Sequence, residues 1–238
     1  NNSVMMGASG ASAYEIERSV RFNKADSAAM SRTPSSAGNR KKWTFSCWFK
    51  KSLVLLSTGE CIFTAKQDGS WNDVISIGSD EKLSFKQENN NTIKQCYSTR
   101  LIKDCTSWYH LVVTQDTTQS TAANRLKMWI NGRQETLTGN FPNQDSDGNF
   151  NRDILHYIGA TKSSSNNNPD FEFNGYMAEI HFIDGTAYDH EDFGEISSTT
   201  GQWVAKEVSG LTYGTNGFYL NFSDNSDVTA TTLGKDQA

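Results

Sequence analysis

Hydrophobic and polar residues alternate with a period of two along much of this chain, which is the repeat of a half-buried β-strand. The alternation is clearest in YHLVVT at 109–114 and in LKMWIN at 126–131. A polar connector at 115–124 separates the two runs and is too long for a two-residue turn, whereas Asn131-Gly132 suits the positive φ values of a tight hairpin turn. The pattern predicts two strands joined by a long loop and followed by a tight turn.

The same strand pattern recurs from the start of the chain to its end. The further runs are SVRFN (19–23), WTFSCWFKK (43–51), CIFTAK (61–66), DVISIGSDEKLSFKQ (73–87), TIKQCYSTRLIKD (92–104), ILHYIGAT (154–161), EFNGYMAEIHFIDG (172–185) and GFYLNFSD (217–224). No amphipathic helix of more than three turns is predicted, and the best helical candidate is DHEDFGEIS, with Asp189 as its N-cap. These features predict an all-β fold: an antiparallel, double-sheet sandwich of the jelly-roll type.

The length of 238 residues suits one large sandwich, and we expect a single domain over 19–228. Residues 1–18 lack the basic region and the sustained apolar region of a secretory signal peptide, so they are predicted to form a flexible leader. The run at 217–224 has strand spacing and is expected to close the sandwich. Residues 229–238 are then a C-terminal tail.

Composition excludes two classes of partner. The formal net charge is -5, and no cluster of basic residues provides an electrostatic footprint for nucleic acid. No stretch approaches the ~20 consecutive apolar residues of a membrane-spanning helix, so membrane insertion is not expected.

The four cysteines are too sparse for a disulfide scaffold, and they include no Cys-x-x-Cys pair. We expect reduced, buried or half-buried thiols at Cys47, Cys61, Cys96 and Cys105. A bridge between Cys96 and Cys105 is the alternative, because antiparallel neighbours could bring these two residues together.

Signals of nucleophilic and nucleotide chemistry are missing. The four histidines, His110, His156, His181 and His190, occur singly, and there is no Gly-x-Ser-x-Gly elbow. No Gly-x-x-x-x-Gly-Lys loop is present to hold a phosphate group. The histidines are therefore interpreted as structural residues.

The order of these strand motifs resembles that of the concanavalin A-like, laminin G-like superfamily, over about residues 19–195. The most specific part is Trp-x-His at 108–110 with the strand pair and Asn-Gly that follow. The Gly of YIGA and the Phe-x-Gly-x-x-Ala-Glu strand before the short helix complete the resemblance. It implies the jelly-roll fold, in which the strands form a scaffold and the loops are places for function.

The C-terminal section, residues 201–237, is similar to a segment that follows such sandwiches in structural proteins of tailed bacteriophages, particularly marine ones. This resemblance implies a virion protein that is assembled in the host cytoplasm. It also implies that the chain is a module or a processed piece of a longer virion protein, with other virion proteins, and further copies of itself, as partners.

The superfamily includes β-glucan hydrolases, whose retaining mechanism needs two carboxylates about 5 Å apart. Those enzymes present the carboxylates as Glu-x-Asp-x-Glu or Glu-x-Asp-x-x-Glu on one strand, and this sequence has no such run. The acidic cluster at 189–195 and the pair Glu172 and Glu179 are interpreted as solvated charges. The chain is therefore not expected to be an enzyme.

Glycan binding is the non-enzymatic use of the superfamily that the sequence fits best. A sugar site needs an aromatic ring for the apolar face of a pyranose and polar groups for its hydroxyls. The candidate residues are Trp71 with its neighbours Asp68, Asn72 and Asp73, and the further aromatic residues Tyr97 and Tyr188. The alternative is that Trp71 folds back over the edge of the sheet.

Calcium is a candidate cofactor. Oxygen-bearing residues recur at every second position in NQDSDGNFNRD, a spacing that a curled loop can wrap around a hard cation. The candidate ligands are Asp145, Asp147, Asn149 and Asp153. The loop lacks the glycine and glutamate positions of an EF-hand, so a plain hydrophilic loop is the alternative.

Two functions follow as hypotheses. The first is an adhesion module of a tail fibre, spike or capsid appendage that holds a host surface glycan without cleaving it. The second is a purely structural decoration or assembly domain that contacts neighbouring virion proteins. A glycoside hydrolase is a third, less favoured reading.

Overall fold

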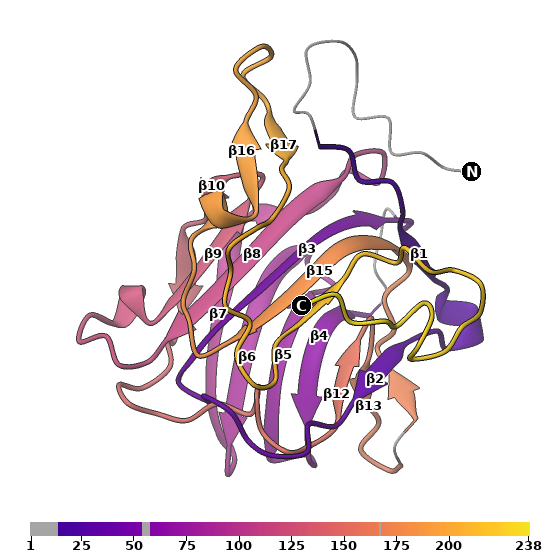
Figure 1. Cartoon of the computed structure of the whole chain (residues 1–238). Coiled ribbons are helices and arrows are strands. Elements are labelled where there is room, and N and C mark those ends of the chain that lie inside the picture. The colour runs from indigo at the N-terminus through magenta and orange to yellow at the C-terminus, as the bar shows by residue number, and fades with distance from the viewer. Residues whose placement is uncertain (1–13, 54–57, 167) are drawn as a thin grey trace.

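The computed structural model describes residues 14–53, 58–166 and 168–238, and it shows two antiparallel sheets packed face to face (Figure 1). Sheet A has the strand order β1-β15-β3-β8-β9-β10, with β18 paired to β15 beside β1. Sheet B has the order β11-β7-β6-β5-β4-β12-β2. The predicted double-sheet jelly-roll sandwich is confirmed.

The strands of sheet A are β1 (Val20–Phe22), β3 (Lys42–Lys51), β8 (Tyr109–Asp116), β9 (Leu126–Ile130), β10 (Arg133–Gln134), β15 (Gly175–Asp184) and β18 (Phe218–Leu220). Those of sheet B are β2 (Met30–Arg32), β4 (Glu60–Lys66), β5 (Trp71–Ile77), β6 (Lys82–Asn89), β7 (Thr92–Leu101), β11 (Leu137–Gly139) and β12 (His156–Ile158). Two small hairpins complete the strands: β13 (Thr161–Lys162) with β14 (Pro169–Asp170), and β16 (Gly194–Ile196) with β17 (Trp203–Ala205). The 3-10 helices are η1 (Lys24–Asp26), η2 (Ala122–Asn124) and η3 (His190–Asp192).

Aromatic rings from both sheets fill the core. Phe45 of sheet A stacks on Phe63 of sheet B, with 4.8 Å between the ring centroids. Phe63 also stacks on Phe150, at 4.6 Å, and Phe150 comes from the loop that closes one end of the sandwich. Buried aromatic side chains contribute large apolar areas, so these contacts fix the spacing of the two sheets.

The strand pair expected from the hydrophobic pattern is present as β8 and β9, and the Asn131-Gly132 turn has φ values of 51° and 72°. One feature differs from the expectation of half-buried strands, because every residue of β8 is buried. The reason lies outside the sandwich, where other parts of the chain cover the outer face of sheet A.

The cover of sheet A comes from both ends of the chain. Phe193 packs with Val112, Trp129 and Ile183 of the sheet, and Ile16 packs with Trp48 and Ala178. The short helix predicted after Asp189 is present as the 3-10 helix η3, where Asp189 forms a capping box with Asp192. The outer face of sheet A is therefore closed by an apolar and aromatic layer.

Parts of both predicted tails join the sandwich. Residues 1–13 of the expected leader lie outside the described residues, but Tyr14 donates a hydrogen bond to Glu179 of β15 at 2.9 Å. At the other end, the backbone N–H of Gln237 donates to the carbonyl of Tyr219 on β18, at 2.9 Å. The chain thus docks on sheet A from residue 14 onward and returns across it after residue 228.

All four cysteines are free. Cys96 points into the core, whereas Cys105 lies in a loop and donates its S–H to the carbonyl of Leu53, so the alternative bridge is not formed. Within the described part of the chain, no helix is long and apolar enough to cross a membrane.

Candidate functional site

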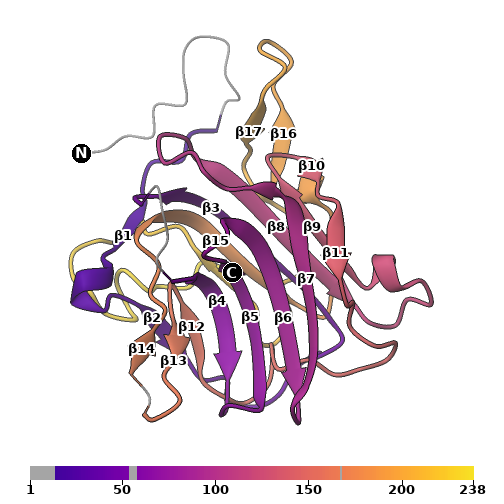
Figure 2. The same ribbon diagram turned by 180° about the vertical axis from the view of Figure 1, so that it is seen from behind.

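The outer face of sheet B differs from that of sheet A in being open. Figure 2 shows strands β5 and β6 facing the viewer with no other segment of the described chain drawn over them. Along these strands, residues such as Ile75 and Phe85 point into the core, so their neighbours in sequence point outward. The outward positions form three rows across the sheet.

The rows are polar at nearly every position. Each row takes one residue from β5, one from β6 and one from β7. The first row is Val74, Lys86 and Gln95, the second is Ser76, Ser84 and Tyr97, and the third is Asn72, Glu88 and Ile93. The hydroxyls of Ser76 and Ser84 are hydrogen-bonded at 2.9 Å. Tyr97 is half-buried at the side of this face. We call these nine residues the sheet B face.

Glu88 is the most constrained group of the sheet B face. Its carboxylate accepts hydrogen bonds from Asn72 Nδ2 at 2.9 Å and from Lys86 Nζ at 3.0 Å. Burial raises the pKa of Glu88, but the hydrogen bonds from Lys86 and Asn72 outweigh it, so the pKa lies below its usual value. Glu88 is therefore ionised at neutral pH and positions an amide and an ammonium group.

The β13–β14 hairpin borders the sheet B face on the side of β4. Thr64 donates to the carbonyl of Ala160 at 3.0 Å, and Lys66 Nζ donates to the carbonyl of Lys162 at 2.8 Å. Burial lowers the pKa of Lys66, and the positive charge of Lys86 lowers it further. The carboxylate of Asp170 on the same hairpin opposes this change, so this border of the face carries charges of both signs.

The sheet B face carries mainly hydroxyl, amide and ammonium groups and few carboxylates. At the outward positions of β4 to β7 in the described chain, Glu88 is the single carboxylate. Retaining and inverting hydrolysis both need a pair. Hydroxyl, amide and ammonium groups beside a tyrosine ring are instead the groups that orient a sugar.

The structure does not bring the predicted glycan-binding residues together at one site. Asn72 and Tyr97 both belong to the sheet B face. Asp68 lies in the turn before β5 and accepts a hydrogen bond from the backbone of Ser70. Trp71 is half-buried at the start of β5, and the guanidinium of Arg152 lies 5.4 Å from its ring centroid.

Asp73 and Tyr188 lie away from the sheet B face. Asp73 is fully buried, and its carboxylate accepts the backbone N–H groups of Asn149 and Phe150 at 2.6 and 3.0 Å. Burial raises the pKa of Asp73 to about 6, although these hydrogen bonds oppose the change. Tyr188 belongs to the cover of sheet A, and its hydroxyl accepts the backbone N–H of Thr212.

The predicted calcium loop closes one end of the sandwich. Asn149 is buried and donates to Asp73, while the exposed Asp145 and Asp147 lie 3.8 and 3.6 Å from Lys41 and Arg40. Asp153, also exposed, completes the predicted set. Among the described residues, no group of three or more His, Cys, Asp or Glu side chains could hold a metal ion. Calcium binding by this loop stays a prediction, and in the structure the regular spacing serves turns and hydrogen bonds.

The histidine environment agrees with a structural role. His110 is buried beneath the cover of sheet A, where its Nδ1 accepts the indole N–H of Trp203 at 2.9 Å. Nε2 therefore carries the proton and donates to Ser46 Oγ at 3.0 Å, so it cannot act as a base toward that hydroxyl. Burial lowers the pKa of His110 to about 3. This serine–histidine contact is not a catalytic pair.

Sequence reasoning missed Ser76, Ser84, Lys86 and Gln95. Each stands at an alternate position of a predicted strand, which places it opposite the core side, so the signal was present in the spacing. What the spacing could not show was that this outer face, unlike that of sheet A, stays uncovered.

Comparison with solved structures shows the same fold at low sequence identity. The native heptameric SAP-like pentraxin from Limulus polyphemus has a TM-score of 0.52 and 16% identity, with 86% of this chain and all of that chain covered. The Ruminococcus gnavus IT-sialidase CBM40 bound to alpha2,3 sialyllactose has a TM-score of 0.47 and 11% identity, with 68% and 95% covered. No curated protein matches the sequence.

The family comparison covers most of the sandwich. A family model described as the concanavalin A-like lectin/glucanases superfamily matches residues 23–191. This range runs from the end of β1 to η3 and includes every strand of the sheet B face. The chain therefore belongs to the concanavalin A-like lectin/glucanases superfamily.

Proposed function

We propose that this domain is a non-catalytic glycan-binding module and that the glycan lies on the sheet B face. The observation that carries the proposal is the contrast between the two sheets. The outer face of sheet A is closed by an apolar and aromatic layer, whereas no described segment lies over the outer face of sheet B, whose rows are mainly polar. Membership of a superfamily of lectins and glucanases supports a sugar as the ligand.

The roles of the side chains follow from their chemistry. Tyr97 can place its ring against the apolar side of a pyranose. Because the side chain is already half-buried, it loses little conformational entropy on binding. Gln95 and Lys86, one row away, supply an amide and an ammonium group for hydroxyls. The carboxylate of Glu88 accepts a hydrogen bond from Lys86 on the same strand, so the ammonium group is already oriented before a sugar binds.

The proposal is tested by binding of the purified chain to an array of bacterial and marine polysaccharides. Tyr97→Ala is expected to weaken saturable binding by about tenfold or more, which corresponds to the loss of about 1.4 kcal/mol. Tyr176→Ala is the matched control, since Tyr176 is another half-buried tyrosine, on β15 of sheet A. Equal loss in both variants, or no saturable binding by the native chain, would refute the assignment.

The non-catalytic part of the proposal is tested separately. A bound polysaccharide is incubated with the native chain, and reducing ends are measured over time. Because Glu88 stands without a second carboxylate on its face, no reducing ends are expected to form. Formation of reducing ends by the native chain but not by Glu88→Gln would show hydrolysis and contradict this part of the proposal.

The virion setting is a proposal that rests on the resemblance of the C-terminal section to phage structural proteins. Binding of a host surface glycan would make the domain an adhesion module of a tail fibre, spike or capsid appendage. Antibodies against the chain are expected to label intact phage particles in electron micrographs. Labelling of infected-cell cytoplasm with unlabelled particles would argue against a virion location.

A structural assembly role is the second candidate, and one observation favours it. The β16–β17 hairpin projects from the sandwich (Figure 1), and Ile196 on it is 68% exposed. An exposed isoleucine on a projecting hairpin can contact another virion protein or a second copy. Under this reading, Ile196→Lys would reduce co-assembly and leave glycan binding intact, whereas under the adhesion reading Tyr97→Ala would reduce glycan binding alone.

A further inference from the structure

A cavity of about 540 Å³ opens at the edge of the sandwich, away from the sheet B face. It lies between β1, β15 and β18 of sheet A and β2, β4 and β12 of sheet B. Residues 228–236 also line it. This volume is in the range of pockets that hold small organic ligands.

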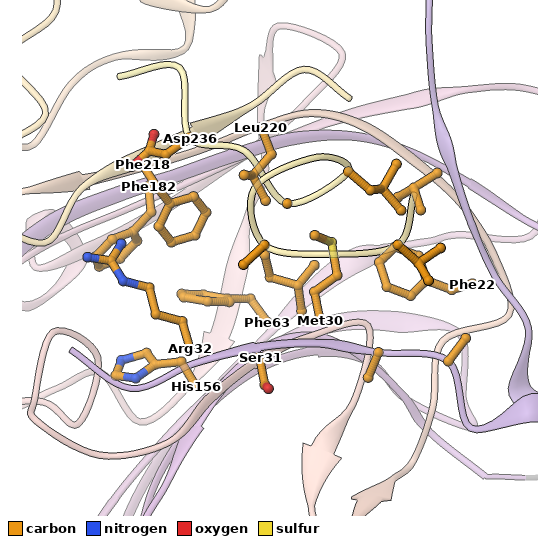
Figure 3. Close-up of a pocket in the computed structure, with 18 of the residues that line it drawn as sticks. Phe22, Met30, Ser31, Arg32, Phe63, His156, Phe182, Phe218, Leu220 and Asp236 are labelled. Carbon is orange, nitrogen blue, oxygen red and sulfur yellow. The ribbon is translucent and has the colours of Figure 1, made fainter. Parts of the chain in front are cut away.

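The interior of the cavity is apolar. Its main side chains are Phe22, Met30, Phe63, Phe182, Phe218 and Leu220. Figure 3 shows Phe22, Met30, Phe63 and Leu220 surrounding one common space. Water gains few hydrogen bonds from such walls, so the space favours an apolar occupant. The chemistry of the lining therefore selects a hydrocarbon group.

Polar groups gather at one end of the cavity. Figure 3 shows Arg32, His156 and Asp236 together at the end opposite Phe22. His156 is held between the backbone N–H of Asn151 and the carbonyl of Ile154, and burial lowers its pKa to about 4, so it is neutral. The charged groups at this end are therefore Arg32 and Asp236.

Asp236 and Arg32 differ in their hydrogen-bond and ion-pair partners. Asp236 accepts the backbone N–H groups of Tyr219 and Ala238 at 2.9 and 3.0 Å. Arg32 is exposed, donates once to the carbonyl of Asn216 at 3.1 Å, and pairs with no carboxylate of the described chain. The remaining N–H donors of its guanidinium are free to bind an anion.

We propose that this cavity binds a fatty-acid-like amphiphile, with its hydrocarbon chain among the phenylalanines and its carboxylate on Arg32. A long acyl chain suits an apolar space that has, at one end, an arginine without a carboxylate partner in the described chain. The C-terminal segment passes over the cavity, with Leu233 packed against the core and Gly234 beside Met30. This segment forms one wall of the cavity and would shield that side of the acyl chain from water.

The test is titration of the full chain with cis-parinaric acid, a fatty acid that fluoresces in apolar surroundings. A saturable rise at one probe per chain is expected, together with displacement by palmitate and a higher melting temperature in the presence of palmitate. Absence of saturable binding by the native chain would overturn the proposal.

Two variants locate the binding. Arg32→Gln should weaken palmitate binding about tenfold and leave binding of palmitate methyl ester unchanged, because the ester has no charge for Arg32 to meet. Arg133→Gln, an exposed arginine on β10 at the far edge of sheet A, is the matched control and should change neither. Unchanged palmitate binding by Arg32→Gln would contradict the assigned orientation.

Ala230→Trp, at an exposed position of the C-terminal segment that lines the cavity, should fill part of the space and weaken both ligands. If this variant does not fold, the exposed Arg32→Gln still decides the orientation. If the folded Ala230→Trp variant binds palmitate as tightly as the native chain, the acyl chain lies elsewhere and the proposal is overturned.

Discussion

The buried carboxylate of Asp73 makes the stability of this sandwich depend on pH. Asp73 anchors the closing loop through Asn149 and Phe150, in a site without solvent exposure. Burial raises its pKa from 3.8 to about 6 in the folded protein, and the hydrogen bonds it accepts only partly oppose this change. A raised carboxyl pKa means that the folded state binds the proton more tightly than the unfolded state.

The sign and size of the effect follow from this difference. The contribution of Asp73 to stability is fully present below pH about 4 and is lost as the pH rises to about 6. The loss amounts to about 3 kcal/mol, because one pKa unit corresponds to about 1.4 kcal/mol. Asp73→Asn retains an acceptor for the two backbone N–H groups and does not titrate.

The assay is urea unfolding of the native chain and of Asp73→Asn between pH 4 and 7. The free energy of unfolding of the native chain, minus that of the variant, should fall by about 2.5 kcal/mol over this range, because pH 4 already lies slightly above the unfolded pKa. Asp73→Ala should be destabilised by about 3–5 kcal/mol at pH 4, because the loop donors lose their acceptor in a buried site. A difference between native chain and Asp73→Asn that is flat with pH, or that increases, would refute the reasoning.

Three further outcomes are expected. Gly132→Ala should lower the free energy of unfolding by at least about 1 kcal/mol in urea titrations, because Gly132 has a φ of 72° and a Cβ there would meet the ring of Trp203; an unchanged midpoint would contradict this contact. Asp189→Ala should lose about 1 kcal/mol of stability through its capping box, whereas Asp189→Ser should recover most of it; equal stability of both would count against the cap. Ellman's reagent should modify Cys105 rapidly in the native chain and the other three thiols only after unfolding, since burial raises the pKa of those three; rapid reaction of a second thiol would contradict the buried positions.

The strands could be predicted because their alternation is a local property of the sequence. The runs that became β8 and β9, the positive φ values at Asn131-Gly132 and the cap at Asp189 all depend on neighbours within a few residues. Asn72 and Tyr97 were named only as a polar and an aromatic residue in polar surroundings, and the strand register places both on the outer side of the sheet.

The location of the open face could not be predicted in this way. It depends on the return of the chain after η3, which brings Phe193 and Trp203 over sheet A and leaves sheet B uncovered. Trp71 was a reasonable sugar platform by composition, but its ring lies beside the guanidinium of Arg152. The function of the Asn and Asp run at 143–153 could not be predicted either, because turn formation and cation binding use the same residue types.

The central claim is that the sheet B face holds the glycan, and it is tested most directly by NMR. The backbone amides of the ¹⁵N-labelled chain are assigned, and a saccharide identified on the array is titrated in. The account predicts saturable shift changes confined to β5, β6 and β7, with the largest at Gln95 and Tyr97. Changes centred on the cover of sheet A or on the turn at Trp71, with the sheet B face unaffected, would contradict it.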